Sequence, residues 1–162
     1  AKHYQTGEVI PAELIQKLSD SGKYGQGFAT VEYLAASLLD MDYHVLKSVP
    51  ADLNVMQFEE KVLGDRGILK QIPSRYRTTY FNHTMGGGYT AGYYSYVWAE
   101  VLDCDAFQAY VEKGNLFDQE VATKFRNYIL TPGGIDDAME MYKRFRGREP
   151  EVGPLLENRG LN

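Results

Sequence analysis

The chain has 162 residues, with 17 Lys and Arg against 22 Asp and Glu, so its formal net charge is −5. Such an acidic chain lacks the basic face that phosphate contacts require, which argues against nucleic-acid binding. The longest uncharged stretch, Thr78 to Ala99, contains Asn82, His83 and several tyrosines and is too polar to span a membrane. Cys104 is the only cysteine, which excludes an internal disulfide and a multi-thiolate metal site.

Short helices separated by glycine and proline are predicted along the first part of the chain. Pro11 and Gly22 bracket the first of these helices. An apolar stripe that starts at Val31 predicts an amphipathic helix from Phe28 to about Leu46. A pattern that resembles a capping box begins at Asn54 and predicts a third helix.

The rest of the chain is predicted to be mostly helical after an irregular stretch. Tyr76 to Phe81, rich in Thr and aromatic residues, is typical of a short strand or an extended loop. A long helix is predicted from Thr90 to about Glu112, ahead of the helix stop at Gly114. Further helices are predicted over residues 118–131, 136–146 and 155–158. Together these patterns predict a single all-α domain over residues 1–162, an irregular multi-helix bundle of six or seven helices.

A row of tyrosines is the most informative feature of the sequence. Tyr89, Tyr93 and Tyr96 stand at i, i+4 and i+7, so a continuous helix would place them on one face. A buried phenol needs a hydrogen-bond partner, and three on one face suggest a wall that faces water or a polar ligand. Aromatic residues at this spacing are also common in cores. Three consecutive glycines precede the row and would let an extended ligand lie against the chain: Gly86, Gly87 and Gly88.

Several polar residues near this row are candidates for ligand binding. The imidazole of His83 can donate a hydrogen bond, although a histidine beside Phe81 is more often a packed ring. Arg75 and Arg77 could bind a substrate carboxylate in bidentate fashion, although most arginines are solvated surface residues. The sequence contains no His-Glu-x-x-His motif, no Gly-x-Ser-x-Gly motif and no phosphate-binding loop. It therefore offers no self-contained catalytic set and no metal site.

The segment from His83 to Trp98, HTMGGGYTAGYYSYVW, resembles the substrate-side motif of the thimet oligopeptidase/neurolysin family of zinc metallopeptidases. The six-residue spacing of His83 and Tyr89 is similar to that of the bacterial peptidyl-dipeptidase (dipeptidyl carboxypeptidase) branch. Segments that resemble the same family lie along nearly the whole chain, at residues 1–7, 34–41, 75–81, 145–150 and 155–161.

The resemblance implies a helical enzyme whose two halves flank a deep channel, with this chain as the C-terminal, substrate-side portion. Tyr96 and Tyr89 match tyrosines that bind the developing oxyanion or adjacent carbonyl groups. Tyr93 and His83 match side chains that bind the substrate. The glycine run at residues 86–88 matches a mobile loop over the channel.

The zinc site of that family is absent from this sequence. The family holds zinc with His-Glu-x-x-His and a downstream Glu, so the resemblance implies that ligands and general base lie upstream of Ala1. We therefore expect a piece of a longer peptidase that releases C-terminal dipeptides from oligopeptides. Alone, the piece is expected to bind no zinc and to be inactive. Its partners would be the oligopeptide substrate and the missing zinc-binding half, and the interface exposed by that half's absence would allow self-association.

One alternative is a non-catalytic helical module that binds peptides or a partner protein through the tyrosine face. It predicts a gene that starts just before Ala1, so the coding sequence upstream would separate the two hypotheses. A second alternative is a structural bundle without a ligand, which burial of all three tyrosines would favour. The single free thiol and the absence of a signal-like opening stretch predict a cytoplasmic protein.

Overall fold

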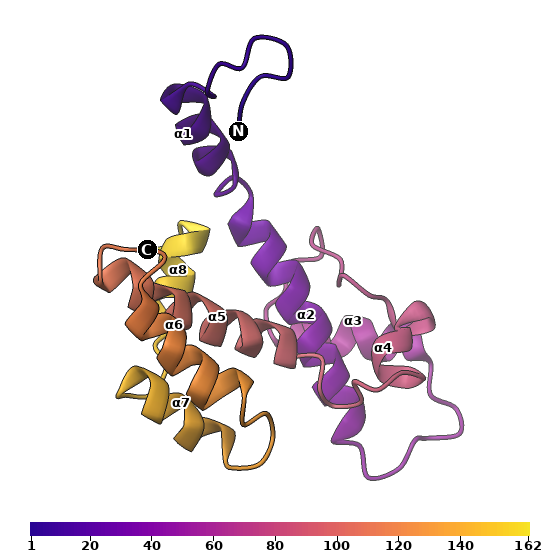
Figure 1. Ribbon diagram of the computed structural model, residues 1–162. Coiled ribbons are helices and arrows are strands. Elements are labelled where there is room, and N and C mark those ends of the chain that lie inside the picture. Colours follow the sequence, from indigo (N-terminus) through magenta and orange to yellow (C-terminus); the bar gives the residue numbers. More distant parts are fainter. The chain divides into compact units, whose positions relative to one another are not determined.

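The computed structural model describes residues 1–162 as helices joined by turns, and the predicted all-α fold is confirmed (Figure 1). The one β pairing is an isolated antiparallel bridge between Lys2 and Val9. None of the helices combines the length and the apolar character needed to cross a membrane. The chain forms two compact units, one of residues 1–94 with 159–161 and the other mainly of residues 95–158. The expected single domain over residues 1–162 stays a prediction.

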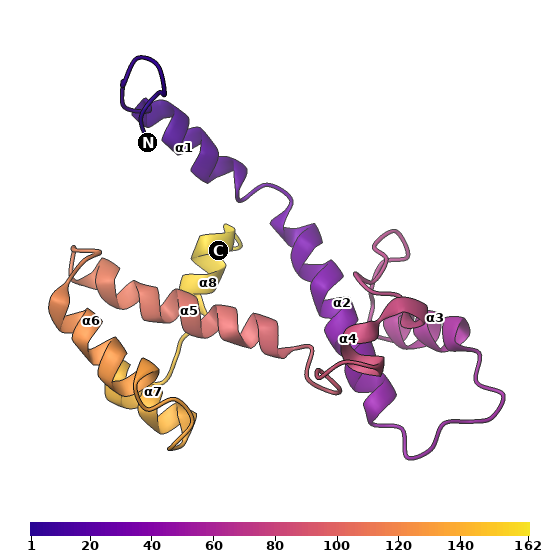
Figure 2. The same ribbon diagram turned by 45° about the vertical axis from the view of Figure 1, so that its right-hand side comes forward.

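The first unit contains four α-helices and one short 3₁₀-helix. These are α1 (Ala12–Ser21), α2 (Gln26–His44), α3 (Val55–Asp65), η1 (Thr78–Tyr80) and the single-turn α4 (Asn82–Met85). Both views show α3 and α4 beside the C-terminal half of α2 (Figures 1 and 2). The α2 helix carries two small cores: Ala35 and Leu39 pack with Leu63 of α3, and Ala36 packs with Phe81 and Tyr93.

The second unit contains the remaining helices. These are α5 (Ser95–Glu112), α6 (Gln119–Phe125), the π-helical turn η2 (Arg126–Leu130), α7 (Ala138–Arg146) and α8 (Gly153–Arg159). Its core joins α5, α6 and α7 through Ala109, Val121, Tyr142 and Phe145. Of these helices α7 is strongly amphipathic, and its apolar face packs against α5 and α6 because water disfavours exposed apolar surface.

Helix caps place the starts of three helices close to where the sequence predicts them. The Asn54 side chain accepts hydrogen bonds from Met56 N and Gln57 N, both at 3.1 Å, at the start of α3. Asp118 caps α6 through Val121 N at 2.9 Å, and Asp137 caps α7 through Glu140 N at 3.0 Å. Each cap satisfies backbone N–H groups that have no partner within the helix.

Two local predictions are wrong. Residues 90–94 form turns, and α5 starts at Ser95 instead of Thr90. Residues 78–80 form a 3₁₀-helix, so the segment Tyr76 to Phe81 contains no strand. In each segment a side-chain carboxylate from another helix binds backbone N–H groups: Asp40 binds those of Ala91 and Tyr93, and Glu59 binds that of Thr78. These bonds compete with the regular structure that local propensity favours.

Candidate functional site

Three of the predicted site residues lie together in the first unit, within a cluster of aromatic rings. The ring of His83 lies 5.5 Å from that of Tyr93 and 6.0 Å from that of Tyr89, measured between centroids. Tyr76 and Phe81 complete the cluster, with their rings stacked at 5.1 Å. The structure therefore brings His83, Tyr89 and Tyr93 together although residues 89–93 are not helical.

Tyr93 forms the buried base of this cluster. Only 4% of its surface is exposed, and its ring stacks on Tyr33 of α2 at 5.2 Å. The Tyr33 hydroxyl donates a hydrogen bond to the Tyr93 carbonyl oxygen at 2.5 Å. Burial raises the pKa of the Tyr93 phenol, while the nearby Arg75 guanidinium lowers it by a smaller amount. The phenol is therefore protonated at neutral pH and can donate a hydrogen bond.

Tyr89 forms the accessible side of the cluster. It is 39% exposed, and His83 beside it is partly buried. The backbone N–H of Tyr89 donates to the His83 carbonyl oxygen at 3.0 Å, which closes the glycine turn between these two residues. The turn thus holds the imidazole and the phenol close together on a partly open surface.

The glycine turn requires a glycine at one position in particular. A Cβ atom at Gly87 would lie 2.8 Å from the His83 carbonyl oxygen and 3.0 Å from that of Asn82, both backbone atoms. A Cβ atom at Gly86 would meet the flexible Asn82 side chain at 2.9 Å, and one at Gly88 would meet nothing within 4 Å. Close packing of the backbone therefore requires glycine at position 87, whereas there is space for a side chain at Gly88.

Gly87→Ala is expected to lower the free energy of unfolding by about 1–3 kcal/mol, because the turn must move to relieve the contact. Gly88→Ala is the matched control and should change it by no more than about 0.5 kcal/mol. Urea denaturation of both variants, followed by circular dichroism, measures the difference. Equal stabilities of the two variants would contradict this account of the turn.

A buried carboxylate that the sequence analysis missed anchors the segment after the glycines. Asp40 of α2 is fully buried, and its carboxylate accepts hydrogen bonds from the backbone N–H groups of Ala91 at 3.1 Å and Tyr93 at 3.0 Å. These bonds hold the turn that interrupts the predicted helix. The sequence gives one signal, a charged residue inside the apolar pattern of α2, but not the atoms that it binds.

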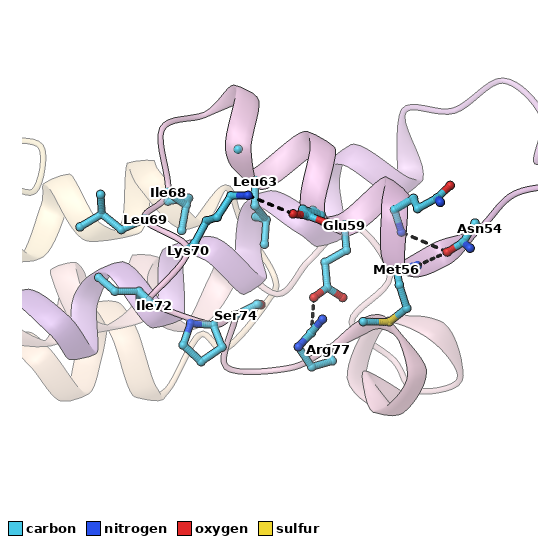
Figure 3. Close-up of a pocket in the computed structure, with 14 residues that line it drawn as sticks. Asn54, Met56, Glu59, Leu63, Ile68, Leu69, Lys70, Ile72, Ser74 and Arg77 are labelled. Atoms are coloured by element: carbon cyan, nitrogen blue, oxygen red, sulfur yellow. Dashed lines mark hydrogen bonds and ion pairs between the residues drawn. The ribbon is translucent and has the colours of Figure 1, made fainter.

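Arg77 contacts a different carboxylate, that of Glu59 in α3. Figure 3 shows Glu59 reaching from α3 to the Arg77 guanidinium, beside a cavity of about 380 Å³ between α3 and the segment that leads to η1. Glu59 is buried and also accepts hydrogen bonds from Thr78 N and Thr78 Oγ1, both at 2.9 Å. Arg77 thus helps to neutralise a buried charge. Binding of a substrate carboxylate by Arg77 stays a prediction.

The structure places Tyr96 in the second unit, in the first turn of α5, where it is 42% exposed. Tyr89 and Tyr93 precede this helix, so the expectation that the three tyrosines share one helix face is wrong. The reason is the turn at residues 90–94, whose backbone bonds to Asp40 in place of the next helical turn. The predicted catalytic role of Tyr96 does not depend on a shared helix and stays a prediction.

The residues of this chain do not fit a zinc site. No three side chains of the His, Cys, Asp and Glu types lie together in a way that could hold a metal ion. The three imidazoles have separate neighbours: His3 accepts from Thr6 N, His44 contacts Asp40, and His83 lies among aromatic rings.

Comparison with known proteins gives a consistent family assignment. The sequence matches the profile of Peptidase family M3 over residues 1–161. It is 42% identical over 163 residues to the dipeptidyl carboxypeptidase of Escherichia coli (strain K12), covering 100% of this chain and 24% of that protein. It is 37% identical to the oligopeptidase A of Salmonella typhimurium, covering 98% of this chain and 23% of that protein. It is 31% identical to the saccharolysin of Saccharomyces cerevisiae, covering 99% of this chain and 22% of that protein. The chain thus spans about a quarter of the length of these relatives.

Proposed function

Because this chain belongs to peptidase family M3, we propose that it is the substrate-binding and oxyanion-stabilising C-terminal portion of a zinc metallopeptidase that releases C-terminal dipeptides from oligopeptides. The observation that carries the proposal is the cluster in which His83 and Tyr89 meet on a partly open surface above the buried Tyr93. An imidazole and phenols can donate hydrogen bonds to the carbonyl groups of an extended peptide.

Phenols suit the stabilisation of an oxyanion. Attack of water on a peptide carbonyl concentrates negative charge on one oxygen, and a preorganised donor lowers the energy of that state. A tyrosine hydroxyl has an ordinary pKa near 10 and therefore keeps its proton at neutral pH. In this proposal Tyr96 and Tyr89 donate to the oxyanion or to an adjacent carbonyl, while His83 and Tyr93 bind the substrate. The turn at Gly86, Gly87 and Gly88 lets the peptide approach the backbone.

The metal belongs to other polypeptide in this proposal. When bound, zinc polarises a peptide carbonyl and a water molecule. This chain offers no ligand set for zinc and spans only about a quarter of its relatives, so we place the ligands and the general base outside these 162 residues. The chain alone is then expected to be inactive, and its main partner is the polypeptide that carries the zinc ligands.

We propose dipeptide release in preference to internal cleavage because of the names and identities of the relatives. The chain is 42% identical to a protein named dipeptidyl carboxypeptidase and 37% identical to one named oligopeptidase A. We also propose a cytoplasmic location. Self-association through exposed apolar surface is proposed for the chain when it is separate, since Leu14, Ile15 and Leu18 of α1 are all exposed.

Product analysis tests the proposed function. The protein that combines this chain with the zinc-binding portion is incubated with oligopeptides that end in a free carboxylate or in an amide, and the products are identified by mass spectrometry. We expect dipeptides from the free C-terminus, and strong loss of cleavage after amidation. Internal cleavage that is insensitive to amidation would show an endo-oligopeptidase, and peptide binding without any cleavage would favour the non-catalytic binding module.

A further inference from the structure

We propose that Asp40, supported by His44, is a positioning residue that fixes the segment from Tyr89 to Tyr93 against α2. The inference rests on the proposed function, because it concerns how that site keeps its shape. In the proposed function neither side chain contacts the substrate itself. Their effect on the reaction would be transmitted through the backbone of residues 91–93.

Both oxygens of the Asp40 carboxylate are used in this contact. Oδ1 accepts from Ala91 N at 3.1 Å, and Oδ2 accepts from Tyr93 N at 3.0 Å. His44 lies one helical turn further along α2, with Nδ1 2.9 Å from Oδ1 and 2.7 Å from the Asp40 carbonyl oxygen. A carbonyl oxygen can only accept, so Nδ1 carries the proton and points at Asp40. The carboxylate is thereby held in one orientation.

The bond to Ala91 holds an unfavourable backbone conformation. Ala91 has a φ angle of 51° and is the one residue other than glycine in the left-handed region. That region is disfavoured for residues with a Cβ atom, so the turn needs an external interaction to keep it. A buried carboxylate that binds two N–H groups supplies this interaction, since charge-assisted hydrogen bonds are stronger than neutral ones.

One face of α2 acts as the support for the whole segment. Tyr33, Ala36 and Asp40 stand at i, i+3 and i+7, which places them along one side of the helix. Tyr33 bonds the Tyr93 carbonyl oxygen, Ala36 packs against Phe81 and Tyr93, and Asp40 binds two N–H groups of the segment. Asp40 is the only charged residue of the three. Its loss would therefore release the turn while leaving the aromatic packing in place.

The experiment uses the whole peptidase and combines kinetics with hydrogen–deuterium exchange of peptides that cover residues 89–96. Asp40→Asn replaces one carboxylate oxygen, which accepts a hydrogen bond from a backbone N–H group, with an amide NH₂ group, which cannot accept one. One N–H group of the segment therefore loses its partner. We expect about five- to thirty-fold faster exchange there and at least about a ten-fold lower kcat, with KM within two-fold. Asp42→Asn on the same helix is the matched control, because Asp42 pairs with Arg66 instead, and it should leave both readouts unchanged.

A rescue variant separates positioning from general destabilisation. Glycine adopts the left-handed region without penalty, so Ala91→Gly added to Asp40→Asn should recover about five- to thirty-fold of any lost kcat. A purely structural role of Asp40 would give no such recovery. If Asp40→Asn does not fold, His44→Ala should show a smaller acceleration of exchange in the same peptides.

The outcomes for the two proposals are distinguishable. Unchanged exchange at residues 89–96 in both the Asp40 and His44 variants would overturn the positioning role, and so would faster exchange with an unchanged kcat. If the wild-type protein cleaves no peptide, the proposed function fails. The exchange data then decide alone whether Asp40 and His44 hold the turn: acceleration supports that anchor, and its absence overturns it.

Discussion

Asp105→Ala is expected to lower the free energy of unfolding by about 3 kcal/mol, the largest stability loss that we predict for a single side chain. Asp105 is fully buried in the second unit and accepts hydrogen bonds from Tyr142 Oη at 2.6 Å, Arg146 Nε at 3.1 Å and Arg148 Nη2 at 2.7 Å. Its removal leaves these donors without their common acceptor. This value lies at the low end of the stability losses that follow from breaking a buried ion pair. The reason is that Arg146 still binds the Glu112 carboxylate through two 2.9 Å hydrogen bonds.

Urea denaturation followed by circular dichroism measures this loss. Glu120→Ala is the control, because Glu120 is an exposed carboxylate that also pairs with two cations, Lys113 and Lys124. Exposed pairs contribute only about 0–1 kcal/mol, so the control variant should remain close to the wild-type stability. Equal losses in the two variants would contradict the claim that burial makes the Asp105 network important.

The same network gives the stability a pH dependence with a defined sign. Burial acts to raise the pKa of the Asp105 carboxyl, but hydrogen bonds from Tyr142, Arg146 and Arg148 outweigh it and hold the pKa below the ordinary 3.8. A carboxyl whose pKa is lower in the folded state contributes fully above its unfolded pKa, and the contribution disappears as the pH falls through the folded pKa. The wild type should therefore lose stability below about pH 4 more steeply than Asp105→Asn. Parallel curves for the two proteins would contradict this assignment.

Tyr96→Phe is expected to lower kcat of the whole peptidase by about 10²–10³-fold with little change in KM, if Tyr96 donates to the oxyanion. The substitution removes one hydroxyl and keeps the ring, so packing at the start of α5 is retained. A donor that acts mainly in the transition state changes kcat, whereas uniform binding changes KM. Steady-state kinetics on a peptide that releases a dipeptide measure both constants.

Tyr94→Phe is the matched control for this measurement. Tyr94 is an exposed phenol two residues away that no part of the proposed mechanism uses, so its kcat and KM should equal those of the wild type. Equal values of kcat/KM for Tyr96→Phe and wild type would remove Tyr96 from the mechanism. The remaining donors at Tyr89 and His83 would then need separate tests.

The helix boundaries that the sequence predicted well depend on local chemistry. Asn54, Asp118 and Asp137 cap α3, α6 and α7 through backbone atoms two or three residues away, so a short window of sequence contains the whole interaction. The all-α class follows from the same caps and from amphipathic stripes. The family was also accessible from the sequence, because the segment His83 to Trp98 carries its motif within sixteen consecutive residues.

The errors arise where residues distant in sequence determine the backbone. The start of α5 depends on Asp40, whose bonds to Ala91 and Tyr93 span more than fifty positions. Local propensity favours continuing that helix, and only the folded unit shows the competing carboxylate. The partners of Tyr93 at Tyr33 and Tyr76 were missed for the same reason. The pairing of Arg77 with the buried Glu59 likewise needed the packing of α3.

Photo-crosslinking of a bound peptide tests most directly whether this chain provides the substrate-side surface. An oligopeptide that carries a photoreactive side chain next to the cleaved bond is irradiated on the whole peptidase, and the protein is then digested with trypsin. Residues 78–112 contain no Lys or Arg, so one tryptic peptide ending at Lys113 holds the glycine turn and all three tyrosines. We predict adducts on this peptide, localised by mass spectrometry to residues 83–96 and displaced by unlabelled substrate. Displaceable adducts confined to other parts of the protein would contradict the account.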